Sequence, residues 1–148
     1  MVCVAEVSLD VEAPIDTVWA LLADGWSYAA WVVGASHIRD VDAGWPSPGT
    51  RIHHSVGPWP LTISDTTGVV TCEPRRLLEL DARLWPAGAA RITFTLLARS
   101  ESVTEVRMTE NVVRGPSAFM PAFVQDALLT PRNRETLQRL GALAKGKS

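Results

Sequence analysis

Glu110 interrupts an apolar pattern, which makes it the first candidate for chemistry. Val106, Met108 and Val112 alternate with polar residues, and residues two apart in a strand share one face. Glu110 must then face the interior with them. A buried carboxylate is costly unless it is paired, hydrogen-bonded or protonated. The pattern predicts either a structural carboxylate bonded to helix or loop backbone amides, or a polar anchor or acid/base group in a pocket.

His54 is the candidate partner of Glu110. It shares a strand face with Ile52 and Val56, which places His53 on the opposite face. A register slip of one residue would put His53 in its place. An imidazole beside a carboxylate could move a proton, and a core histidine satisfied by one hydrogen bond is the alternative. Glu110 and His54 are therefore the candidate catalytic residues.

We expect no metal site and no cofactor. Adjacent histidines on opposite faces cannot share one ion, and no further ligands stand at useful spacing. Cys3 and Cys72 lack the spacing of zinc or redox motifs. We expect reduced thiols, although the count allows one disulfide. The sequence has no Gly-rich phosphate loop and no local Ser–His–acid motif, so hydride transfer and nucleotide hydrolysis are poorly supported.

Aromatic residues supply further candidates for ligand contact. Trp59 and Trp85 each precede a proline, which is typical of turns and strand ends. Such rings could rim a cavity mouth and stack on an apolar ligand, or plug the end of the sheet as packing. Tyr28 could donate a phenolic hydrogen bond to a ligand. With His54 and Glu110, the predicted ligand-contacting residues are Tyr28, Trp31, Trp59, Trp85, Phe119 and Phe123.

Composition limits the function classes. The chain has 148 residues, of which 47% are hydrophobic and 20% charged, an ordinary globular composition. A net charge of -2 without a long basic run gives no footprint for nucleic acid. No apolar stretch reaches about 18 residues, and no secretory signal is present. These features predict a single cytoplasmic domain over residues 1–148 with no membrane span, and they leave a homodimer open.

The elements that must position these residues are one strand, two short helices, six strands and a terminal helix. Alternating strands predict an antiparallel sheet with one covered face, against which an amphipathic helix can pack. We expect that helix over 131–144, with Thr130 as N-cap and Pro131 at the first position. A single longer helix kinked at Pro131 is the alternative. The strands are expected at 2–11, 37–41, 51–56, 61–72, 77–85, 90–98 and 103–113, and the second short helix at 26–33.

Four short segments follow one another in a recognisable order. They are 13–19 (APIDTVW) after the first strand, 48–51 (PGTR) entering a later strand, Glu73-Pro74 between strands, and 132–137 (RNRETL) in the last helix. In this order the chain resembles the START-like (SRPBCC) superfamily, and within it the small proteins of polyketide cyclase/dehydrase type. The resemblance implies an α+β helix-grip fold, in which a curved antiparallel sheet of about seven strands wraps around a C-terminal helix.

The resemblance also implies a deep apolar cavity under that helix. Members of the superfamily bind lipids, steroids, polyketides or other hydrophobic molecules, and some catalyse cyclisation or dehydration, without a universal catalytic motif. We therefore expect a protein that binds a small hydrophobic molecule, lipid-like or polyketide-like, between sheet and helix. One alternative is a cyclase or dehydratase acting on a polyketide-like substrate by acid/base chemistry in the same cavity. The other is an interaction module with a filled core.

Overall fold

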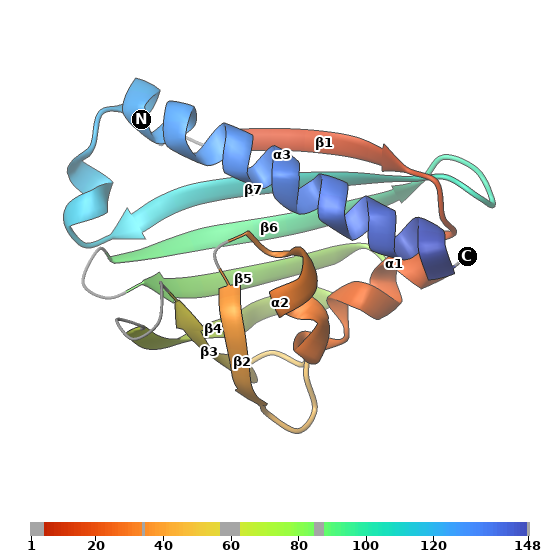
Figure 1. Cartoon of the computed structure of the whole chain (residues 1–148), viewed down its shortest axis with the longest axis horizontal. Helices are drawn as coiled ribbons and strands as arrows, with labels where there is room; N and C mark the ends of the chain where they lie inside the picture. The colour runs from red at the N-terminus through yellow and green to blue at the C-terminus, as the bar shows by residue number, and fades with distance from the viewer. Residues whose placement is uncertain (1–4, 34, 57–62, 85–87, 148) are drawn as a thin grey trace.

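The structure is a computed structural model that describes residues 5–33, 35–56, 63–84 and 88–147. Within the described residues, a strand is followed by three helical segments, then by six strands, a short 3₁₀ helix and a long α-helix (Figure 1). In chain order the elements are β1 (Ala5–Val11), α1 (Ile15–Leu22), η1 (Gly25–Ser27), α2 (Tyr28–Trp31), β2 (Ala35–Val41), β3 (Arg51–Val56), β4 (Ile63–Glu73), β5 (Leu77–Leu84), β6 (Gly88–Ala98), β7 (Thr104–Arg114), η2 (Pro116–Phe119) and α3 (Ala122–Lys147).

The seven strands form one antiparallel sheet in the order β1-β7-β6-β5-β4-β3-β2. The sheet curves, and α3 lies along its covered face beside β1 and β7, with α1 and α2 on the same side (Figure 1). The predicted helix-grip fold is therefore confirmed. At ends that the structure describes, the strands agree with the sequence predictions to within two residues, because alternation of apolar side chains is a local signal.

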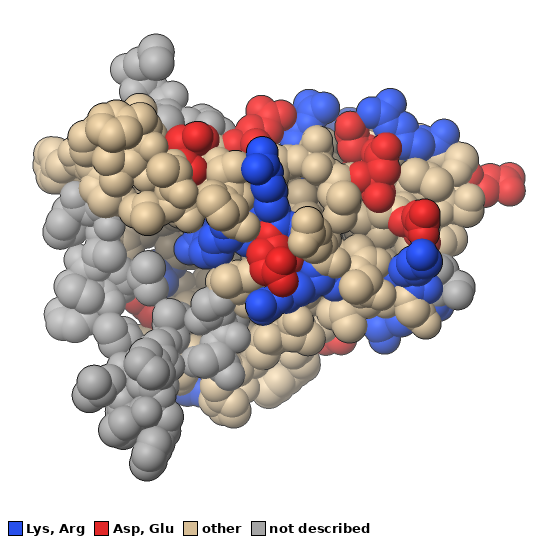
Figure 2. Space-filling view, turned by 45° about the horizontal axis from the view of Figure 1, so that its top comes forward, with Lys and Arg blue, Asp and Glu red and all other residues tan. Residues whose placement is uncertain are grey.

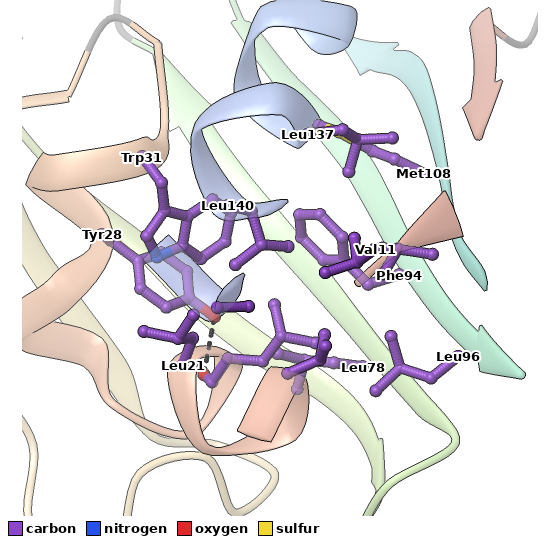
Figure 3. Close-up of a cluster of buried hydrophobic side chains, with 14 of the residues drawn as sticks. Val11, Leu21, Tyr28, Trp31, Leu78, Phe94, Leu96, Met108, Leu137 and Leu140 are labelled. Carbon is purple, nitrogen blue, oxygen red and sulfur yellow. Dashed lines mark hydrogen bonds between the residues drawn. The ribbon is translucent and has the colours of Figure 1, made fainter. Parts of the chain in front are cut away.

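The core lies between this face of the sheet and the helices. Figure 3 shows side chains from β1, α1, α2, the central strands and α3 meeting in one cluster. Phe94, Val106, Leu137 and Leu140 are buried within it. Full burial of side chains of this size contributes about 1.5–3 kcal/mol each, so the cluster holds the C-terminal half of α3 against the sheet.

The terminal helix differs from the main prediction. It runs without a break from Ala122 to Lys147 and contains Pro131. One long helix, as in the alternative, is therefore confirmed, and the N-cap role of Thr130 is wrong. The Thr130 hydroxyl instead donates to Asp126 Oδ1 within the helix, at 3.0 Å. The carbonyl of Pro121 accepts the first helical bonds from Val124 and Gln125. The exposed Pro131 removes one backbone donor, a loss that the helix tolerates.

Charge is unevenly distributed along α3. Figure 2 looks onto the helix and shows acidic and basic side chains along most of its length, whereas the end that carries η2 and the start of α3 is nearly uncharged. None of the helices within the described ranges combines the length and hydropathy needed to cross a membrane.

Candidate functional site

A cavity of about 250 Å³ lies between the sheet and α3. Its wall is largely apolar and draws on α2, on strands β2 to β7, and on the first half of α3. The core is therefore not completely filled, contrary to the interaction-module alternative. The volume is slightly below the ~300 Å³ at which pockets for drug-sized ligands begin, so the space suits a small molecule. The charged and hydrogen-bonding wall residues include His54, Thr67, Arg83, Glu110, Arg132 and Asn133.

Glu110 faces this cavity from β7, where it pairs with Ala5 on β1 and Ile92 on β6. Its side chain is only 5% exposed. Oε1 accepts hydrogen bonds from Arg132 Nη2 and from Asn133 Nδ2, the second at 3.0 Å. Glu110 is therefore an ion-paired carboxylate held by two side chains of α3, and not by the backbone amides that the structural interpretation expected.

Arg132 and Asn133 are the functional residues that the sequence reasoning missed. Asn133 is 1% exposed and also accepts a long hydrogen bond, 3.4 Å, from Arg132 Nε. A signal for it did exist. Asn133 stands four residues before Leu137 and thus on the buried stripe of the helix, where a polar residue interrupts an apolar pattern just as Glu110 does.

His54, and not His53, faces the cavity. The His54 side chain is buried in the wall, and its Nε2 lies 2.9 Å from Thr67 Oγ1. His53 instead binds Asp42 Oδ1 at 2.8 Å. Burial lowers the pKa of His54, with Asp65 opposing the shift and the positive charges of Arg39 and His53 adding to it. The imidazole is therefore neutral at pH 7.

The structure does not join His54 to Glu110. The two residues have different hydrogen-bond partners, and strands β4, β5 and β6 separate β3 from β7 in the sheet. They face the same cavity from separate parts of its wall. Across the described ranges, no three histidine, cysteine or acidic side chains gather as they would around a metal ion.

The hydroxyl donor of Tyr28 is already used within the protein. It donates to the carbonyl of Leu22 at the end of α1, at 2.8 Å (Figure 3), and Trp45 Nε1 donates to the same oxygen at 3.2 Å. Burial, followed by the charges of Cys72 and Asp24, raises the pKa of Tyr28 well above its usual value. The ring of Tyr28 lines the cavity, but the predicted ligand hydrogen bond is wrong.

Trp31 serves the core and does not line the cavity. It is fully buried, and its ring centroid lies 4.5 Å from that of Tyr28 and 5.7 Å from that of Phe94. Its Nε1 donates to Ser27 Oγ at 3.0 Å. The short α2 directs this side chain toward the cluster in Figure 3, so the prediction of a ligand contact is not met.

Phe119, at the end of η2, and Phe123, in the first turn of α3, both point outward. Phe119 is 89% exposed and Phe123 is 75% exposed, and neither lines the cavity. The residues of this segment that line the cavity are instead Met120, Leu128 and Leu129, of which Leu128 is also 59% exposed. The predicted contacts at Trp59 and Trp85 lie outside the described residues.

No family model matches the chain, and no curated protein is similar to it. Among solved structures, the Zhui aromatase/cyclase from Streptomyces sp. R1128 is similar with a TM-score of 0.74 and 18% identity, covering 96% of this chain and 93% of that one. A START superfamily protein from Mycobacterium smegmatis has a TM-score of 0.66 and 14% identity, covering 97% and 95%.

The di-domain aromatase/cyclase StfQ from the steffimycin biosynthetic pathway is also similar, with a TM-score of 0.70 and 13% identity. The match covers 99% of this chain and 52% of StfQ. At these identities the likeness establishes the START-like fold, as the sequence resemblance predicted, and does not extend to ligand or reaction.

Proposed function

We propose that this START-like fold binds a small, largely apolar molecule in the cavity between the sheet and α3. The observation that carries the proposal is the cavity itself. Protein interiors are close-packed, with few voids larger than a water molecule, yet a largely apolar cavity of about 250 Å³ is left beneath α3.

The polar residues of the wall support an oriented ligand. Glu110, Arg132 and Asn133 form one group at β7 and α3, and His54 and Thr67 form another at β3 and β4. With strands about 4.8 Å apart, Thr67 and Glu110 are separated by about 14 Å along the sheet. Apart from Arg83 on β5, the wall that β5 and β6 form between them is apolar. This arrangement suits a molecule with an apolar body and a polar group at one or both ends.

A cyclase or dehydratase is the second candidate function. Two observations favour it: a neutral imidazole, that of His54, stands in the cavity wall, and solved structures of the same fold are named aromatase/cyclases. In such an enzyme His54 would accept a proton and Thr67 would orient its ring. Glu110 is poorly suited to the acid/base role, because Arg132 and Asn133 hold its Oε1.

Native mass spectrometry of protein purified from its own source tests the binding function. We expect a bound species whose excess mass is lost on denaturation and is recovered as a small organic molecule in the solvent extract. Isothermal titration of ligand-free protein with neutral aromatic compounds is the complementary measurement. A protein that carries no such molecule and binds none of the compounds would contradict the proposal.

A further inference from the structure

One carboxylate oxygen of Glu110 is left for a ligand. Oε1 accepts both hydrogen bonds from α3, and Oε2 accepts none from the described residues. Among those residues, the buried side-chain atoms without a hydrogen bond are His54 Nδ1 and Arg91 Nε. Oε2 has no hydrogen bond to these residues and yet is not one of the fully buried atoms, so part of its surface is accessible. Because Glu110 lines the cavity and is 5% exposed, the cavity is the space from which Oε2 can be reached.

Arg132 presents unused donors beside this oxygen. A guanidinium carries five N–H donors. Nη2 donates to Glu110 Oε1 and Nε donates to Asn133 Oδ1, while Nη1 has no hydrogen bond to the described residues. Arg132 also lines the cavity, and its side chain is 35% exposed. The ion pair of Glu110 and Arg132 thus keeps, on two residues that line the cavity, an acceptor and donors that the described residues leave unused.

The charges of this group favour an uncharged ligand. Glu110 and Arg132 neutralise each other, and Asn133 is neutral. A carboxylate on the ligand would meet the negative charge of Oε2, and an ammonium would compete with Arg132 for Glu110. Either would be an extra charge in an apolar cavity, which is costly without its own partner. Arg83 is also a wall residue, but its side chain is exposed and its charge is screened by water.

A hydroxyl group satisfies both atoms at once. Its O–H can donate to Glu110 Oε2 while its oxygen accepts from Arg132, whereas a ketone or an ether offers no donor to Oε2. We infer that the ligand is an uncharged, apolar molecule bearing a hydroxyl group, of about the size of a two-ring aromatic, and that this hydroxyl is bound by Glu110 Oε2. The inference rests on the proposed binding function and adds the chemical class of the ligand.

A matched series of naphthalene compounds tests the inference on the unmodified protein. Isothermal titration at pH 7 would compare 2-naphthol, 2-methoxynaphthalene, naphthalene and 2-naphthoate. Because hydrogen bonds to charged groups are strong, we expect 2-naphthol to bind at least about tenfold tighter than its methyl ether. Equal affinities, or tighter binding of 2-naphthoate, would overturn the inference and leave apolar binding intact. Binding of none of the four would overturn the proposed function as well.

Glu110→Gln is the variant that assigns the preference to this residue. If the amide oxygen of Gln takes over the bond to Arg132, its N–H₂ faces the cavity as a donor. We expect the preference for 2-naphthol over its methyl ether to fall to within about twofold. If Glu110 had a purely structural role, the substitution would lower the affinities for both compounds and leave the ratio of the two affinities unchanged. That result would overturn the inference. The unmodified-protein series decides the matter if this variant does not fold.

Glu105→Gln is the matched control. Glu105 lies on the same strand and pairs with Arg99 at 2.8 Å, but it does not line the cavity. The substitution thus removes a glutamate–arginine pair from β7 without touching the ligand site, and we expect the tenfold preference to persist. If Glu105→Gln also lost the preference for 2-naphthol, that preference would not depend on Glu110 in particular. This result would overturn the inference.

Discussion

Glu110 on β7 and Asn133 on α3 are joined by a hydrogen bond of 3.0 Å between Oε1 and Nδ2. Each residue is the polar member of an otherwise apolar pattern, one with a period of two and the other with a helical period. Both are buried. Each supplies the hydrogen-bond partner that offsets the cost of burying the other. The bond therefore fixes the middle of α3 over the sheet at the edge of the cavity.

Asn133→Ala should reduce the free energy of unfolding by about 1–3 kcal/mol, because Glu110 would lose a buried hydrogen-bond donor. Urea denaturation of the ligand-free protein measures the change. The exposed neighbour Arg134→Ala is the control, for which we expect a change within about 0.5 kcal/mol. Equal stability of the two variants would mean that the bond contributes nothing to holding α3.

Ala90→Phe should fill the cavity. Ala90 lies in its wall on β6, so the added ring would occupy the void. We expect loss of ligand binding by titration with little loss of stability, because the introduced apolar surface enters an existing cavity rather than a close-packed core. Ala98→Phe, at an exposed position of the same strand, should bind as the unmodified protein does. Retained binding in Ala90→Phe would place the ligand elsewhere.

Lowering the pH should destabilise the protein through His54. Its pKa is lowered in the folded state from a reference value of 6.5, so the unfolded chain binds a proton more readily. Stability is therefore full above about pH 6.5 and is lost as the pH falls toward the folded-state pKa. Urea midpoints between pH 7.5 and 5 measure this loss.

His54→Gln should make that pH dependence shallower, because the amide side chain does not titrate. His37→Gln, at an exposed position on β2, is the control and should follow the unmodified protein. If His54→Gln and the unmodified protein lose stability in parallel, the burial of His54 is not the source of the effect.

Tyr28→Phe should separate the core role of this residue from ligand binding. The variant loses the bond to the Leu22 carbonyl, which keeps its bond from Trp45, so we expect a loss of about 0.5–1.5 kcal/mol. Ligand affinity should be unchanged, because the hydroxyl already donates to the Leu22 carbonyl. A marked loss of affinity without loss of stability would instead indicate that the hydroxyl turns toward the ligand.

The sequence by itself determined the strands, their antiparallel arrangement and the inward direction of Glu110. These follow from local periodicity, since alternation along one strand reports which face is covered, whatever lies opposite. The same reasoning, applied to the spacing of Asn133 and Leu137, would have shown a second inward polar residue. The START-like fold could also be predicted from the sequence, because the chain contains short segments in an order that is characteristic of this fold.

Only the tertiary structure decided the partners. Nothing local in the chain states that Arg132 and Asn133 meet Glu110, because that contact depends on how α3 crosses the sheet. The same holds for the Tyr28 hydroxyl, because its hydrogen bond to the Leu22 carbonyl depends on how the end of α1 lies against α2. A proline inside a helix, such as Pro131, costs a few kcal/mol and favours a break. The packing of the flanking helical turns against the sheet overrides this local preference. The distances between elements thus determine which side-chain atoms find hydrogen-bond partners among the described residues, as Glu110 Oε1 does with Arg132 and Asn133.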